Sequence, residues 1–326
     1  MINLKYGLII LGLVITGVIL FGCTLAPNEE ILKMGFMSTP ESALVQVAQE
    51  KGYFAEQGLD VNLVKFTAGK LALQSFLAGG LDFAVVGDVP VTLAKMQGNK
   101  FYVLSQIANC PGENPVLVHG KNITDVKEYF ASTKRKLVTS AGGTPEFYTY
   151  NFLKYYGIDS NQIEIIAQNP ADMPATFIGG FVDAMSVFEP YPSIAEEQLK
   201  GETSRLEIPS EIYSPSYVIV ANKKWVDANP KKAEAILKAL IQAQKYVISN
   251  PKDAKQIIAK VSGFDPKLIE SVWGKCNMQV ELPDSLLQTF KAQSAWVIET
   301  KKADKNSITD FESMLRRDLL KGAKAS

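Results

Sequence analysis

The sequence predicts an α/β protein with two similar lobes, each a sheet flanked by helices, and three observations carry this prediction. Residues 76–90 (FLAGGLDFAVVGDVP) align with residues 177–191 (FIGGFVDAMSVFEPY), and each copy runs from a helix end through a Gly break and an Asp into an apolar run and an acid. The triplet Thr-Pro-Glu recurs at 39–41 and 144–146. Strand and helix patterns alternate along both halves, which is typical of parallel strands joined by helical crossovers.

The bulk composition is that of a globular chain long enough for two cores. It has 326 residues, of which 47% are hydrophobic and 21% are charged. Lys plus Arg number 34 and Asp plus Glu number 34, so the chain lacks the basic excess of a nucleic-acid-binding protein. There is one His, His119, and there are three Cys, which argues against most His-based catalysis and against dense metal sites.

The N-terminus has the pattern of an export signal. Residues 1–22 carry Lys5 and then an apolar run, and Cys23 follows. Leu20-Phe21-Gly22-Cys23 resembles the bacterial lipobox, in which Cys23 receives a lipid and becomes the first mature residue. The alternative is an uncleaved anchor helix, because the apolar run approaches the ~20 residues that span a bilayer. Both interpretations place the folded part outside the cytoplasmic membrane, after a linker at 23–30.

The first half predicts the larger part of lobe 1, residues 31–118. Thr39 suits a helix N-cap, Pro40 suits the first helical position, and Glu41 complements the helix dipole. Gly breaks such as Gly79 mark the ends of helices. The patterns predict strands at 31–37, 61–66, 83–86, 101–108 and 115–118, and helices at 41–51, 70–77 and 91–97.

The same order then restarts and predicts lobe 2, residues 119–214. Its strands are expected at 136–140, 163–167 and 184–188, and its helices at 147–156 and 173–177. Residues 215–326 should return to lobe 1 with a strand at 217–220, followed by helices at 230–249, 251–261, 266–273 and about 309–320. The strands at 115–118 and 217–220 bracket lobe 2, so we expect the crossings between lobes there.

Ligands of open α/β sheets bind outside the carboxyl ends of the strands. Here those ends carry Ser38, Thr39, Asp88, Asn109, Gly143, Thr144 and Glu189. Two helix N-termini, at Thr39 and Thr144, would offer free N–H groups to an anionic ligand group from opposite lobes. The alternative is that both Thr side chains only cap their own helices.

Acids crowd the same rim, which bears on the charge of the ligand. Glu41, Asp88, Glu146 and Glu189 all follow strand ends. They could complement helix dipoles, or Asp88 or Glu189 could bind a ligand amine. Since no Arg lies on these loops and Lys70 is the cation close in the pattern, a zwitterion or a monoanion fits better than a dianion such as sulfate.

Catalytic signals are scarce. The sequence contains no phosphate-binding Gly-x-x-x-x-Gly-Lys, no His-Glu-x-x-His, no Gly-x-Ser-x-Gly and no Cys-x-x-Cys. We expect His119 to be an ordinary surface or hinge residue, and we expect no catalytic residue, cofactor or metal. Cys110 and Cys276 could pair, because exported proteins tolerate disulfides, but we favour two free thiols. The aromatic residues Phe147, Phe188, Tyr191 and Tyr213 are expected in the core rather than in the cleft wall.

Several segments in combination resemble one known family. They are Met34-Gly-Phe-Met-Ser-Thr-Pro-Glu-Ser-Ala-Leu44, Lys51-Gly-Tyr-Phe54, Gly58-Leu-Asp-Val61, Leu77-Ala-Gly-Gly-Leu-Asp82, Val86-Gly-Asp-Val-Pro90, Gly143-Thr144 and Phe188-Glu-Pro-Tyr191. From about residue 31 to 300 the chain resembles the nitrate/sulfonate/taurine family of ABC-transporter substrate-binding proteins. The resemblance implies a type II periplasmic-binding-protein fold that closes on a small ligand and delivers it to a membrane permease.

The resemblance also implies a ligand site, a role and partners. Its contacts would be Ser38, Thr39, Gly69, Asp88, Asn109, Gly143, Thr144 and Glu189. The role would be that of a monomeric, extracytoplasmic, lipid-anchored solute-binding protein for a small organic anion or zwitterion, with an ABC permease as partner and no nucleic acid.

Two departures from the family pattern concern the identity of the ligand. Phe188 replaces a frequent Trp, and Pro145-Glu146 replaces small or hydroxyl residues. One alternative is a binder of a thiamine-precursor aminopyrimidine or a similar aromatic amine. The other is a small-molecule lyase or synthase on the same fold, although the Cys-rich motif and active His of those enzymes are missing here.

Overall fold

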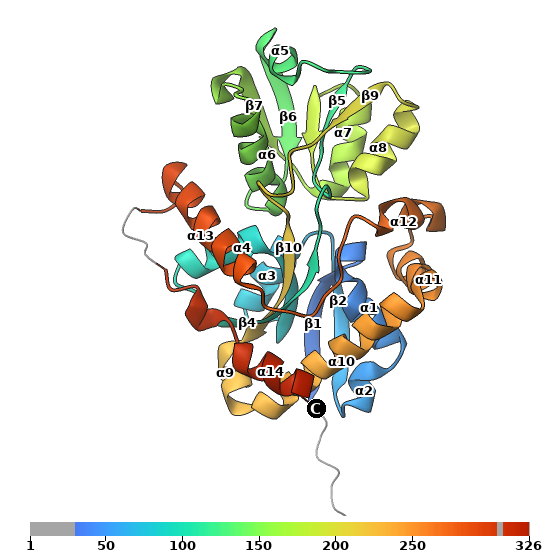
Figure 1. Ribbon diagram of the computed structural model, residues 1–326, viewed down its shortest axis with the longest axis vertical. Helices are drawn as coiled ribbons and strands as arrows, with labels where there is room; N and C mark the ends of the chain where they lie inside the picture. Colours follow the sequence, from blue (N-terminus) through green and yellow to red (C-terminus); the bar gives the residue numbers. More distant parts are fainter. Residues whose placement is uncertain (1–29, 305–308, 326) are drawn as a thin grey trace, which may run out of the picture. The chain divides into compact units, whose positions relative to one another are not determined.

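The computed structural model describes residues 30–304 and 309–325. The predicted signal segment, Cys23 and nearly all of the linker lie outside these residues. Residues from Ile31 onward form one compact unit that contains two five-stranded sheets, each flanked by helices (Figure 1). The predicted α/β fold of two sheet-based lobes is therefore confirmed.

The first sheet belongs to lobe 1 and is mixed. Its strand order is β2-β1-β3-β10-β4. The bounds are β1 (Ile31–Met37), β2 (Asp60–Phe66), β3 (Phe83–Gly87), β4 (Phe101–Asn109) and β10 (Ser216–Asn222). β1 pairs in parallel with β2 and β3, whereas β10 runs antiparallel between β3 and β4. Every residue of β3 is buried, as its unbroken apolar run predicts for a central strand.

The second sheet belongs to lobe 2 and has the order β7-β6-β8-β5-β9. The bounds are β5 (Val116–His119), β6 (Arg135–Thr139), β7 (Ile163–Ala167), β8 (Ala184–Ser186) and β9 (Thr203–Leu206). The strand that we assigned to the end of lobe 1, at 115–118, is β5 and pairs with β8 and β9 of lobe 2. The chain therefore crosses between the sheets at 110–115, the first crossing, and at 207–215, the second crossing.

Helices cover both sheets, and the C-terminal ones return to lobe 1 (Figure 1). α10 packs on α1, α2 and α14, while α13 packs on α4. The predicted last helix begins at Arg317 rather than near 309. The helices are α1 (Ala43–Glu50), α2 (Tyr53–Glu56), α3 (Gly69–Leu77), α4 (Asp88–Met96), α5 (Val126–Ala131), α6 (Thr144–Tyr155), α7 (Met173–Ile178), α8 (Tyr191–Leu199), α9 (Lys223–Ala228), α10 (Pro230–Ser249), α11 (Pro251–Ser262), α12 (Pro266–Trp273), α13 (Asp284–Glu299) and α14 (Arg317–Ala325), with a short 3-10 helix η1 (Pro40–Ser42) before α1.

The repeated Gly-x-x-Asp pattern has the same structural role in both lobes. Gly79 and Gly180 end α3 and α7 with φ angles of 82° and 71°, which glycine adopts without strain. Three residues later, the Asp82 carboxylate accepts a hydrogen bond from the backbone N–H of Lys33 at 2.9 Å. Asp183 accepts one from Lys136 at 2.8 Å. The repeat therefore anchors the beginning of β3 to β1 and the beginning of β8 to β6.

A disulfide joins Cys110 of the first crossing to Cys276, with an S–S distance of 2.07 Å. The expectation of two free thiols is wrong. The segment after α12 runs beside the end of β4, where Asn277 and Asn109 exchange backbone hydrogen bonds of 2.7 and 3.0 Å. This non-local pairing brings together two cysteines that are 166 positions apart in the sequence.

Candidate functional site

A small cavity of about 20 Å³ lies between the lobes, where helix N-termini from both sheets meet. This volume is enough for about one water molecule. Its lining includes three of the predicted contact residues, Gly69, Gly143 and Thr144. The remaining lining residues are Met37, Ala68, Lys70, Gly87, Pro90, Ser140, Pro145, Phe188 and Tyr217.

The lobes touch each other beside this cavity. The Lys70 ammonium of α3 donates a 2.8 Å hydrogen bond to the Ala141 carbonyl of lobe 2. Burial lowers the pKa of Lys70, and the nearby Glu146 carboxylate opposes that shift. A Cβ atom at Gly87 would lie 2.6 Å from the Thr144 Cγ2 atom, so this approach requires glycine. Gly87 of lobe 1 and Thr144 of lobe 2 are therefore in close contact across the lobes.

The two threonines do not act as side-chain caps of their own helices. Thr39 precedes η1 without a capping hydrogen bond, and its hydroxyl donates to the Glu41 carboxylate at 2.5 Å. Thr144 is the first residue of α6, which begins after Gly143 without a side-chain cap. The interpretation in which both residues only cap their helices is therefore wrong for Thr39 and for Thr144.

Asp88 ties the N-terminus of α4 to the second crossing. Its carboxylate accepts hydrogen bonds from the Tyr213 hydroxyl at 2.7 Å and from the Ser216 backbone N–H at 3.0 Å. The side chain is fully buried, and burial raises the pKa of Asp88 to about 6. Asn109 has a similar role, since its amide donates to Ser216 Oγ and to carbonyls of the same crossing. Both residues have partners inside the protein.

Glu189 lies at the centre of an ion-pair cluster in lobe 2. Its Oε1 atom is 2.8 Å from Arg205 and 2.8 Å from the Lys275 ammonium. Its Oε2 atom accepts a 2.8 Å hydrogen bond from the Ser193 hydroxyl. Lys275 precedes Cys276, so the disulfide helps to hold this cation in place. Sequence reasoning missed both cations, because Arg205 comes from β9 and Lys275 from a loop far along the chain.

Two further buried carboxylates lie beside the cavity, and neither was among the predicted contacts. Glu41 and Glu113 are each 1% exposed. Burial raises the pKa of Glu41 to about 7, with the Glu189 charge adding to the shift and the Thr39 hydrogen bond opposing it. Burial also raises the pKa of Glu113, and the negative charge of Glu41 raises it further. The acid between two prolines in Pro111-Gly-Glu-Asn-Pro115 was the available sequence signal for Glu113.

The Glu113 carboxylate is linked to the cavity through Tyr217. The Tyr217 ring lines the cavity, and its hydroxyl donates a 2.9 Å hydrogen bond to Glu113 Oε2. Glu113 Oε1 is buried and has no hydrogen-bond partner. The Tyr217 side chain thus separates the unpaired Glu113 Oε1 atom from the cavity between the lobes.

The other candidates are placed as follows. His119 stacks on Phe177 with ring centroids 4.1 Å apart, within lobe 2. Phe147 and Tyr213 pack in the core of the second lobe, whereas Phe188 lines the cavity. Glu146 accepts a 2.7 Å hydrogen bond from the Gly142 N–H and pairs with Lys302 at 2.8 Å, so this departure from the family pattern has partners within the protein.

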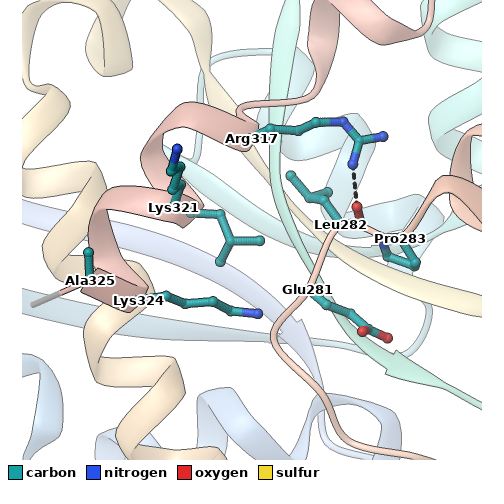
Figure 2. Close-up of a pocket in the computed structure, with 8 residues that line it drawn as sticks. Glu281, Leu282, Pro283, Arg317, Lys321, Lys324 and Ala325 are labelled. Atoms are coloured by element: carbon teal, nitrogen blue, oxygen red, sulfur yellow. Dashed lines mark hydrogen bonds between the residues drawn. The ribbon is translucent and has the colours of Figure 1, made fainter.

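Two larger hollows share no lining residue with the interlobe cavity. One, of about 820 Å³, is lined by polar side chains of the second crossing, α6 and α13, including Asn109 and Ser216. The other, of about 540 Å³, lies between α14 and the segment 281–283 (Figure 2). Figure 2 shows Arg317 donating to the Leu282 carbonyl at its edge, and Arg317 also pairs with Glu312 and Asp284. Since this cation already has protein partners, we assign the hollow no ligand.

Within 30–304 and 309–325, no helix has both the length and the apolar character required to cross a bilayer.

Comparison with known proteins identifies the class. Residues 25–263 match the model of the NMT1-like family, and the chain belongs to that family. Its structure is similar to the crystal structure of the periplasmic aliphatic sulphonate binding protein SsuA from Escherichia coli. The TM-score is 0.74 and the identity is 19%, over 87% of this chain and 91% of that chain. The fold is therefore that of the periplasmic binding proteins.

Particular relatives agree in class. A Bacillus subtilis protein named for aliphatic sulfonate binding is 26% identical over 93% of this chain and 92% of its own length. The nitrate/nitrite binding protein NrtA of Synechococcus elongatus is 27% identical over 67% of this chain. The match spans 55% of that nitrate-binding relative, that is, about half of its length.

The contact between Gly87 and Thr144 predicts a specific steric coupling. Gly87 has φ −67° and ψ 156°, which alanine also adopts, so the cost of Gly87→Ala comes from the clash with the Thr144 methyl group. We expect Gly87→Ala to lower the free energy of unfolding by about 1–3 kcal/mol, or to open the lobes. Thr144→Ser removes the methyl and keeps the hydroxyl, so it should restore most of the loss. Denaturant unfolding and X-ray scattering of the double-mutant cycle measure both effects. An equal cost of Gly87→Ala in both backgrounds contradicts the coupling.

The raised pKa of Glu41 predicts how the stability of the protein depends on pH. Its pKa rises from 4.5 to about 7 on folding, so the folded state holds the proton more tightly. The contribution of Glu41 to stability is therefore greatest at low pH and declines as pH rises through this window. Relative to Glu41→Gln, the wild type should lose up to about 3 kcal/mol of unfolding free energy between pH 4.5 and 7.5. Urea unfolding across this range measures it, and Glu197→Gln, at an exposed position, is the control. Parallel profiles for wild type and Glu41→Gln would rule the effect out.

Proposed function

We propose that this protein is the extracytoplasmic solute-binding component of an ABC importer. It captures a small organic anion or zwitterion of the sulfonate, taurine or nitrate class between its lobes and delivers it to a membrane permease. The observation that carries the proposal is the meeting of α3, α4 and α6 N-termini at one interlobe cavity in an NMT1-like fold. Helix N-termini present backbone N–H groups that favour anionic ligand groups.

Binding requires only that the ligand favour the closed arrangement of the lobes over the open one. The contacts Ser38, Thr39, Gly69, Gly143 and Thr144 would surround the anionic group. Asp88, Asn109 and Glu189 would hold the surrounding framework, since their polar atoms bond to the protein. We expect a monomer that performs no chemistry on its ligand.

The specific class of ligand is supported by the relatives, whose names refer to aliphatic sulfonates and to nitrate. A second candidate ligand is an aminopyrimidine, bound between the lobes after they open. Phe188 would then provide an aromatic wall, and the buried carboxylates would accept hydrogen bonds from the amino group. This second candidate is favoured by the presence of Glu41 and Glu113.

A thermal-shift screen of purified protein distinguishes these candidates. The probes are alkanesulfonates, taurine, nitrate and 4-aminopyrimidines. A specific ligand present at about 100 times its own dissociation constant stabilises the folded protein by about 2.7 kcal/mol. We expect a sulfonate or taurine to raise Tm by several degrees. A shift with aminopyrimidines alone would favour the second candidate. Recovery of a chemically changed ligand would instead support the lyase alternative, and the absence of any shift contradicts the proposal.

We also propose that Cys23 anchors the mature chain to the membrane through a lipid. The support is the lipobox-like Leu20-Phe21-Gly22-Cys23 at the end of the apolar segment. Metabolic labelling with palmitate in a bacterial host should mark the wild-type chain and should be lost in Cys23→Ala. Membrane association without any label would indicate the uncleaved anchor helix.

A further inference from the structure

We propose that Glu41 and Glu113 together form a binding site for an ammonium or amidinium group, so that the ligand captured between the lobes carries a positive charge. The inference rests on the proposed solute-binding function and specifies the chemistry of one end of the ligand. Glu41 comes from η1 in lobe 1, and Glu113 comes from the first crossing. Both carboxylates are almost completely buried.

The first argument is charge balance. Arg205 and Lys275 both pair with Glu189, and Arg205 also pairs with Glu196. Among the described residues, Glu41 and Glu113 form no ion pair, and each accepts a side-chain hydrogen bond only from a neutral hydroxyl, of Thr39 and Tyr217 respectively. A buried carboxylate without a cation is costly unless it takes up a proton or binds a cation.

The second argument is that several buried polar atoms around this pair have no hydrogen-bond partner. Glu113 Oε1 is buried and makes no hydrogen bond. The same holds for Ser42 Oγ, next to Glu41, and for both amide atoms of Asn114, next to Glu113. Leaving one such acceptor without a donor costs about 1–3 kcal/mol. A ligand group with several N–H donors would satisfy Glu113 Oε1 and neutralise the pair.

The third argument is access. Tyr217 separates the pair from the interlobe cavity, with its ring on the cavity side and its hydroxyl on Glu113. The Thr144 hydroxyl interacts with the same Tyr217 side chain. Once the Tyr217 side chain moves aside from Glu113, a ligand between the lobes would meet the α6 N-terminus at one end and the carboxylates at the other. Opposite electrostatic environments at the two ends match a zwitterion or a cationic ring with an anionic substituent.

A proton and a ligand cation compete for the same pair. The groups that face Glu41 are Thr39, Glu113, Glu189, Tyr191 and Tyr217, and Arg205 and Lys275 lie beyond Glu189. Because the pKa of Glu41 is about 7, its carboxylate is largely protonated at pH 6 and largely ionised at pH 8. A cationic group should therefore bind about tenfold more tightly at pH 8 than at pH 6, and its binding should release a proton.

Calorimetry with matched probes tests the inference. The pairs are taurine with 1-propanesulfonate, β-alanine with butyrate, and benzamidine with benzamide, so that each cation-bearing probe has a counterpart without the cation. We expect a cation-bearing probe to bind at least tenfold more tightly than its counterpart. Glu41→Gln and Glu113→Gln should each lose at least tenfold for that probe and little for the counterpart, whereas Glu197→Gln should behave like the wild type.

A second measurement does not depend on how the variants fold. Titration of the wild type in two buffers of different ionisation enthalpy counts the protons released on binding, and we expect a net release near pH 7. Equal affinity for the cation-bearing probes and their counterparts, no proton release, or no binding of any cation-bearing probe overturns the inference. If sulfonates or nitrate nevertheless bind, the proposed solute-binding function stands. If nothing in either probe set binds, both proposals fail.

Discussion

Burial of carboxylates between two lobes is the constraint around which this structure is arranged. Among the described residues, Glu41, Asp88, Glu113 and Glu189 are each 2% exposed or less. An ionised carboxylate removed from water needs a cation, several hydrogen-bond donors or a proton. Glu189 has two cations, and Asp88 has a hydroxyl, a backbone N–H and the N-terminus of α4. Glu41 and Glu113 have one side-chain hydroxyl partner each, so these two are the carboxyl groups that need a proton or a cation.

The partners of these acids also hold the two crossings together. Tyr213 and Ser216 bind Asp88 from the second crossing and from β10, while Cys110 of the first crossing is bonded to Cys276. β10 itself lies between β3 and β4, which places Tyr217 directly under the cavity. The two crossings and the buried carboxylates are therefore linked through the same few residues.

The internal repeat explains the similar backbone of the two lobes, but not the different partners of Asp88 and Glu189. Asp82 and Asp183 occupy equivalent positions and make equivalent bonds to the backbone of β1 and β6. Asp88 and Glu189 are also equivalent in the repeat, yet one binds the second crossing and the other binds Arg205 and Lys275. The two lobes thus share a local backbone arrangement. The side chains that bind Asp88 and Glu189, however, come from segments outside the repeat.

By itself, the sequence determined the features that depend on local patterns. Apolar runs, Gly breaks and Thr-Pro-Glu starts predicted most strands and helices and the two-lobed fold, because these signals act within a few residues. Tertiary structure decided the insertion of β10 between β3 and β4, the Cys110–Cys276 disulfide, the cations on Glu189 and the isolation of Glu41 and Glu113. Each of these depends on contacts between distant segments and on burial. The buried neighbours of a carboxylate decide whether it keeps its charge. These neighbours come from distant segments, so a pattern along the chain does not reveal them.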